Sequence, residues 1–142
     1  MDPSKKAFIE RKKLEREVRK LERDVDSAVV EGFSDKRVLE RLGFTGKIFL
    51  SAERTMEDLS EDLERGSQRT VILTDFDRHG KEENKKLNQF LQDRDIDVLN
   101  SGRKQFGAQL TSTGRMTLED AEPLFSSKFD KFAEAALDGL YL

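Results

Sequence analysis

The stretch that decides the fold stands at residues 71–81, which read VILTDFDRHGK. An apolar run rich in β-branched residues predicts a buried strand, and two acids, Asp75 and Asp77, follow where that strand ends. Open α/β sheets place their chemistry at the carboxyl ends of their strands. Because neighbouring carboxylates repel unless a positive charge lies between them, the pair favours a hard divalent cation such as Mg²⁺.

A second segment has the same pattern. Residues 27–35 read SAVVEGFSD, an apolar strand that ends in an acid and a glycine, Glu31 and Gly32. In a parallel sheet with right-handed crossovers, the carboxyl ends of neighbouring strands share one edge. We therefore expect Glu31 to lie beside Asp75 and Asp77 if the two strands are neighbours.

Strand and helix alternate along residues 27–100, which predicts an α/β fold with a parallel sheet between two layers of helices. The two most uniformly apolar strands should be central, which gives a Rossmann-like three-layer α/β/α arrangement with the strand order 2-1-3-4. The order then reverses between Glu31 and Asp75. The predicted strands span 27–31, 47–51, 70–74 and 96–100, and the predicted helices between them span 35–42, 55–65 and 80–93.

These residues resemble the Toprim domain shared by type IA and type II topoisomerases, bacterial-type primases and several nucleases. The likeness covers residues 27–100 and is carried by Glu-Gly after the first strand and by Thr-Asp-x-Asp-Arg-x-Gly after the third. The resemblance implies that Glu31 is a general acid or base at a metal site and that Asp75 and Asp77 hold Mg²⁺ or Mn²⁺. Gly32 and Gly80 are then the glycines of the structural motif.

Two features limit what the resemblance implies. Lys81 stands where type IA topoisomerases usually carry a further glutamate, which weakens that variant of the mechanism and leaves the metal pair untouched. A chain of 142 residues has no room for a strand-passage gate, and without cysteine it cannot build the zinc module of many primases. We expect neither a complete topoisomerase nor a complete primase.

The composition indicates a folded, highly charged protein. Charged residues make up 39% of the chain, yet the apolar residues recur in compact runs, which is unlike a disordered segment. Cysteine is absent, which excludes disulfides and thiolate metal sites. No apolar run approaches the roughly 18 residues of a membrane span, and the N-terminus lacks the apolar core of a signal peptide. We expect a cytoplasmic protein with no membrane partner.

Positive charge is concentrated near the N-terminus. The net charge is −3, but residues 5–23 contain nine Lys or Arg against four Glu. We expect residues 1–26 to form a basic amphipathic helix over 4–24, whose local charge favours an RNA or DNA partner. The candidate backbone-binding residues on this helix are Lys12, Lys13, Arg16 and Lys20.

The same helix carries a narrow apolar stripe through Leu14, Val18 and Leu21. Two arrangements fit this stripe. It can dock on the helical layer of the sheet, or it can pair with a second copy and make a homodimer.

Further basic residues are candidates for phosphate contact at the acidic edge. A helix that starts at Gly80 would direct its free amides and positive end toward this edge. His79, inside the motif, is interpreted as an exposed bystander. The candidate phosphate-binding side chains are Arg78, Lys81, Lys36, Arg37, Arg103 and Lys104.

Residues 101–142 are expected to be a C-terminal extension packed on the same domain. Residues 101–115, rich in Gly, Ser, Thr and Gln, predict a basic loop at the active edge. Helices are predicted from Thr117 to Leu124 and over 127–140, the second with inward-facing phenylalanines.

Two functions fit this sequence. The first is a nucleic-acid-binding Toprim protein that hydrolyses RNA or DNA, in which a metal at Asp75 and Asp77 neutralises phosphate and Glu31 handles the proton. The alternative is a non-catalytic RNA- or DNA-binding subunit of a larger processing complex. The first function requires Glu31, Asp75 and Asp77. The second requires only the basic helix and a metal site, and the sequence contains the residues for either function.

Overall fold

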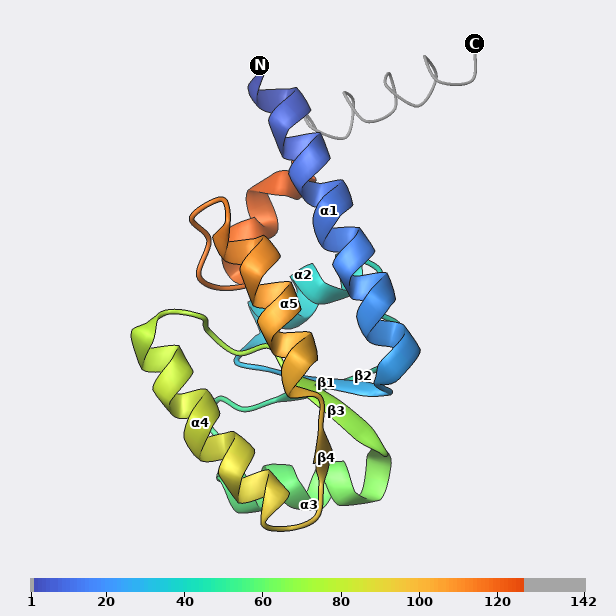
Figure 1. Ribbon diagram of the computed structural model, residues 1–142, viewed down its shortest axis with the longest axis vertical. Helices are drawn as coiled ribbons and strands as arrows, with labels where there is room; N and C mark the ends of the chain where they lie inside the picture. Colours follow the sequence, from blue (N-terminus) through green and yellow to red (C-terminus); the bar gives the residue numbers. More distant parts are fainter. Residues whose placement is uncertain (1, 127–142) are drawn as a thin grey trace.

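The computed structural model describes residues 2–126 and has helices on both faces of a small parallel sheet (Figure 1). The four strands lie in the order β2-β1-β3-β4, and every pair is parallel. The predicted α/β fold and strand order are therefore confirmed. The elements are α1 (Pro3–Asp24), β1 (Ser27–Val30), α2 (Phe33–Arg41), β2 (Lys47–Leu50), α3 (Met56–Gly66), β3 (Arg69–Ile72), α4 (Arg78–Gln92), β4 (Asp97–Val98), α5 (Asn100–Thr111) and the 3₁₀ helix η1 (Glu119–Phe125).

The two central strands are the most completely buried of the four. All four residues of β1 are buried, and so is β3 after Arg69. Both faces of a parallel sheet are covered by helices, so its inner strands are mostly apolar on both faces; the buried polar residues Ser27 and Thr70 stand at their starts. The register pairs Val29 with Ile72, so the two strands end side by side at the same edge.

Alternate side chains of the central strands pack into two separate hydrophobic cores. Ala28 and Val71 face a core that α1, α2 and α5 cover, whereas Val29 and Ile72 face a second core under α3 and α4. The sheet is thus the middle of three layers. The second core also contains the helix residues Leu59, Leu63, Leu87 and Leu91.

Helix α1 docks on the rest of its own chain. Leu14 and Val18 have no exposed surface, and α1 packs along α5. Glu10 anchors the N-terminal half, because it accepts hydrogen bonds from Nε and Nη2 of Arg115 at 2.9–3.1 Å. The apolar stripe is therefore buried within one chain, as the docking arrangement predicts.

The predicted loop over 101–115 is wrong for residues 101–111 and holds only for residues 112–115, which follow the helix. Residues Asn100–Thr111 form α5, because Phe106 and Leu110 lie one turn apart and are both fully buried. Its two interior glycines allow close packing: a Cβ on Gly102 would lie 2.8 Å from Leu21, and one on Gly107 would lie 2.7 Å from the ring of Phe76. Tertiary packing here overrides a composition with weak helix propensity.

Smaller differences concern the ends of elements. Helix α2 begins at Phe33 with Gly32 as its N-cap, two residues before the predicted start at residue 35. Helix α4 begins at Arg78 and not at Gly80, and the helix predicted from Thr117 is the 3₁₀ helix η1, which contains Pro123. The helix predicted over 127–140 lies outside the described residues.

No helix within residues 2–126 is both long enough and apolar enough to cross a membrane.

The buried stripe of α1 makes a testable prediction. Leu14→Ala should lower the free energy of unfolding by about 2–5 kcal/mol, because it opens a cavity in the first core. Urea denaturation at several protein concentrations measures this loss, and the exposed neighbour substitution Lys13→Ala is the control, with an expected change within about 0.5 kcal/mol. A loss that varied with protein concentration would indicate pairing between copies instead.

Candidate functional site

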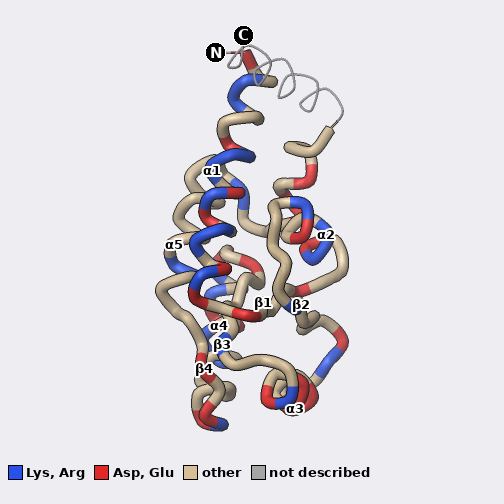
Figure 2. The backbone as a smooth tube through the Cα atoms, turned by 90° about the vertical axis from the view of Figure 1, so that its right-hand side faces the viewer, with Lys and Arg blue, Asp and Glu red and all other residues tan. Residues whose placement is uncertain are grey.

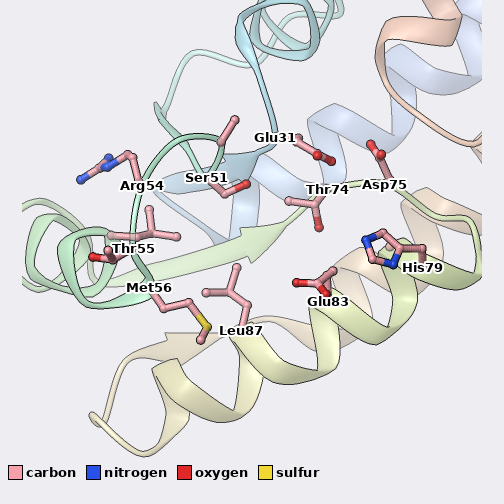
Figure 3. A pocket seen from close by; sticks show the side chains of 13 residues that line it. Glu31, Ser51, Arg54, Thr55, Met56, Thr74, Asp75, His79, Glu83 and Leu87 are labelled. Atoms are coloured by element: carbon pink, nitrogen blue, oxygen red, sulfur yellow. The ribbon is translucent and has the colours of Figure 1, made fainter.

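The candidate site lies where β1 and β3 end. The Leu73 amide donates to the Val29 carbonyl at 2.7 Å, which extends the pairing of the two strands up to this edge. Glu31 follows β1 directly and Asp75 follows β3 after two residues. Their carboxyl groups lie within hydrogen-bonding distance of each other, and Figure 3 shows both at one end of the cleft. The predicted juxtaposition of Glu31 and Asp75 is therefore present in the structure.

The contact changes the acidity of Asp75. Burial raises the pKa of Asp75 to about 7, and the hydrogen bond with Glu31 and the negative charges of Glu31, Asp35 and Asp77 contribute to this rise from 3.8. Two carboxylates are both acceptors, so such a contact needs a proton or a cation between them.

Asp77 is placed differently from the prediction. Its side chain caps α4, with Oδ1 accepting from the Gly80 amide at 2.7 Å, and it does not line the cleft. Across residues 2–126, no three His, Cys, Asp or Glu side chains are gathered closely enough to hold a metal ion. The structure thus brings Glu31 and Asp75 together and turns Asp77 toward the helix.

Gly80 is required by close packing at the same corner. A Cβ at this position would lie 2.2 Å from the carbonyl oxygen of Asp75, a separation that no side chain tolerates. The start of α4 therefore lies directly against the backbone that carries Asp75. This fixes the position of the acidic residue relative to the helix.

Arg103, which was predicted to contact phosphate, is a buried residue whose guanidinium binds main-chain carbonyls and also lines the groove between α4 and α5. Only 8% of it is exposed, and its guanidinium donates to the carbonyls of Ile72, Thr74 and Asp75 at 3.1, 3.0 and 2.7 Å. Its Cζ also lies 4.3 Å from the ring centroid of Phe76. Burial lowers the pKa of Arg103 to about 10, and the Asp75 carboxylate opposes that fall, so the side chain stays charged at neutral pH. Arg103 holds the segment between β3 and α4 in place.

The cleft beside the acidic pair has a volume of about 240 Å³. Sequence reasoning missed most of its walls, which come from the loop after β2 and from one face of α4 (Figure 3). The predicted strand order could have identified the loop after β2, because β2 runs parallel to β1 and ends at the same edge of the sheet. The polar lining residues beyond the acidic pair are Ser51, Arg54, Thr55, Thr74, His79 and Glu83.

Asp35 is a further acid that the sequence patterns did not single out. It is buried, and its carboxylate accepts from the Gly32 amide at 3.1 Å and the Glu119 amide at 2.9 Å. It thereby ties the turn after Glu31 to the 3₁₀ helix. The sequence signal for this contact is an acid three residues after the N-cap of a helix, as Asp35 is after Gly32.

The other predicted phosphate-binding residues lie around the cleft and not in it. Lys81 and Lys104 line a separate groove between α4 and α5, whose lining residues include no acid. Arg78 is nearly fully exposed and its ion-pair partner, Glu82, is 4.0 Å away. Lys36 lies on α2, with its Nζ 5.9 Å from the ring centroid of Phe33.

On α1 the basic residues alternate with acids, as Figure 2 shows. Lys12 pairs with Glu15 and Lys20 with Glu17, each at 3.3 Å. Lys13 and Arg16 are exposed. The helix thus carries a positive face, but part of its charge is already neutralised locally.

Fold and site together define a small α/β protein with an acidic cleft at the carboxyl edge of a parallel sheet, where the strand order reverses. A UPF0292 protein of Methanocaldococcus jannaschii is 32% identical over 108 residues, which cover 75% of this chain and 81% of that protein. The chain belongs to the UPF0292 family. No protein-family model matches it.

Two further comparisons agree with this assignment and with the fold. A UPF0292 protein of Methanosarcina barkeri is 40% identical over 52 residues, which span 37% of this chain and only 36% of that protein. A solved structure of a protein from Aquifex aeolicus superposes with a TM-score of 0.63 at 22% identity, covering 77% of this chain and 95% of that one. The structural match shows the fold alone.

The hydrogen bonds of Arg103 predict a large effect of its removal. Arg103→Met should destabilise the protein by about 1–3 kcal/mol or more, because it leaves carbonyls at the end of β3 buried without donors. Arg103→Lys should restore only part of the loss, since one ammonium cannot replace both guanidinium nitrogens. Urea denaturation compares these variants with the control Lys104→Met on the exposed face of α5. Equal stability of Arg103→Met and the control would contradict the assigned role.

The raised pKa of Asp75 predicts a pH dependence in the absence of metal. The folded protein holds this proton more tightly than the unfolded chain, so the associated stability is complete below pH 3.8 and is lost as the pH rises through about 7. Asp75→Asn carries no such charge. The variant should therefore gain stability relative to the wild type between about pH 5 and about pH 8, as measured by thermal unfolding in EDTA. A constant difference across this range would contradict the shift.

Proposed function

We propose that this protein is a Toprim-type nucleic-acid-binding protein that hydrolyses phosphodiester bonds with the help of Mg²⁺ or Mn²⁺. The observation that carries the proposal is the contact between the carboxyl groups of Glu31 and Asp75 at the shared edge of β1 and β3. Holding two carboxyl groups together beside a polar cleft costs free energy, and such arrangements commonly mark functional sites. The Glu-Gly and Asp-x-Asp motifs that resemble the Toprim domain supply these same side chains.

The donor set fits a hard divalent cation. Glu31 and Asp75 offer carboxylate oxygens, which Mg²⁺ prefers, and a cation between them would replace the proton that their contact otherwise needs. Oδ1 of Asp77 accepts the hydrogen bond that caps α4, so Oδ2 is the oxygen that would remain for a cation. When bound, the ion would neutralise negative charge on a phosphate and lower the pKa of an attacking water.

Other residues of the chain would transfer the proton and bind the phosphates of the substrate. Glu31 is exposed at the end of β1 and is the group that would transfer the proton. Lys81 and Lys104, in the groove between α4 and α5, would hold a neighbouring phosphate of the same strand. Lys13 and Arg16 on the open face of α1 would add attraction that depends on salt and not on metal.

One observation favours the alternative function, a non-catalytic RNA- or DNA-binding subunit of a processing complex. Within the described part of the chain, no three acidic or histidine side chains converge, and Asp77 is turned toward α4. A site with two carboxylates can still bridge a phosphate through a metal ion without performing chemistry.

A cleavage assay separates the two functions. Purified protein is incubated with labelled structured RNA, single-stranded RNA or DNA, and duplex DNA, each with Mg²⁺, Mn²⁺ or EDTA. We expect metal-dependent cleavage that Glu31→Gln slows by roughly 10²- to 10⁴-fold, the usual contribution of general acid–base catalysis, with substrate binding retained.

The matched control is Glu83→Gln, which removes another carboxylate from the wall of the same cleft but not from the acidic pair. Its cleavage rate should stay near that of the wild type. Cleavage that persists in Glu31→Gln would point to a contaminant or to another base. Binding without cleavage under all conditions would favour the alternative function.

A further inference from the structure

Phe33 is an exposed aromatic residue beside the candidate site. Its exposed fraction is 63%, the highest among the large apolar side chains of residues 2–126, of which only Met56 and Met116 are also exposed. It is the first residue of α2 and follows Glu31 by two positions. Two extended residues span at most about 7 Å, so the backbone of Phe33 lies within that distance of Glu31.

The side chain of Phe33 does not pack in either hydrophobic core. The inward face of this helix carries Val38 and Leu39, which have no exposed surface. At 3.6 residues per turn, Phe33 lies on the opposite side, together with Lys36 and Arg37. The ring is therefore displayed on the outer face of the helix.

Two cations flank this ring. Nζ of Lys36 lies 5.9 Å and Cζ of Arg37 lies 5.7 Å from the ring centroid. Arg37 makes only a distant ion pair with Glu122, at 3.8 Å, between two well-exposed side chains. A largely exposed aromatic side chain with two cations close to its ring matches the two parts of a nucleotide, a flat base and a phosphate.

We propose that Phe33 is a stacking platform for an unpaired nucleobase next to the phosphate at Glu31 and Asp75, and that Lys36 and Arg37 contact the backbone phosphates on either side of that base. The inference rests on the proposed function and names its substrate class as single-stranded RNA or DNA. Bases within a duplex already stack on their neighbours, so an exposed ring can take only a base that is unpaired or at an end.

The chain contains no tryptophan, so Phe33→Trp introduces a single fluorescent reporter at this position. The variant is titrated in EDTA with short single-stranded RNA, single-stranded DNA, a duplex of equal length, and a strand with abasic sites. Stacking should quench the fluorescence with both single strands and leave it unchanged with the duplex and the abasic strand. The comparison of RNA with DNA shows which sugar the surface prefers.

The matched control is Phe90→Trp. Phe90 also lies under a cation, with Cζ of Arg94 4.4 Å from its ring centroid, but it is near the C-terminal end of α4. Its fluorescence should not respond to any of the oligonucleotides. Circular dichroism of both variants verifies that the fold is retained.

Affinity gives the second readout. In the same metal-free buffer, Phe33→Ala should bind single strands roughly 5- to 150-fold more weakly than the wild type, the usual range when one base–aromatic stack is removed. Phe33→Leu should not restore binding, because an aliphatic side chain has no π-face. Replacing Lys36 and Arg37 with Gln should flatten the dependence of affinity on salt, by about 0.7 in the logarithmic slope for each phosphate that the protein no longer neutralises.

The outcomes separate this inference from the proposed function. Wild-type binding that Phe33→Ala and abasic strands leave unchanged would overturn the stacking platform alone. Quenching and weaker Phe33→Ala binding without cleavage by the wild type would support the platform and refute the hydrolytic function. Absence of all nucleic-acid binding would overturn both. A change in sedimentation showing that Phe33→Ala dissociates a dimer would overturn the platform in favour of contact with a second copy.

Discussion

The parallel pairing of β1 with β3 is the constraint on which the rest of the molecule depends. Because Val29 lies opposite Ile72 and both strands run the same way, the residues that follow them emerge at one edge of the sheet. Helices leave this edge in opposite layers, α2 over the first core and α4 over the second. The cleft exists because the strand order reverses here, and the carboxyl groups of Glu31 and Asp75 meet at its end (Figure 3).

This meeting of two carboxyl groups is held by the surrounding structure and not by their own attraction. Arg103 donates to carbonyls on both sides of the turn after β3, and Gly80 lets α4 approach the backbone of Asp75. The raised pKa of Asp75 reflects its burial first, and then the contact with Glu31 and the negative charges around it. Groups maintained under such unfavourable conditions commonly mark functional sites, which is the physical basis of the proposed metal-dependent function.

Sequence patterns predicted the sheet order and the contact of Glu31 with Asp75, because buried strands and their acidic ends are properties of short segments. They failed at α5, where helix formation depends on Phe106 and Leu110 packing against distant elements. The role of Arg103 was missed for the same reason, since nothing in the local sequence shows that it would be buried. Asp77 illustrates a local competition: an acid before a helix can cap it or bind a ligand, and residue spacing alone does not decide which.

The central claim is that the Glu31–Asp75 pair binds a divalent cation. Titration calorimetry with Mn²⁺ tests it most directly, performed near pH 7 in buffers of different ionisation enthalpy so that proton release is measured as well. We expect that the wild type binds the ion and releases protons, because the cation displaces the proton that Asp75 partly carries near pH 7, and that Asp75→Asn loses most of this affinity. Equal affinity in the wild type and Asp75→Asn, or binding without any proton release, would contradict the account.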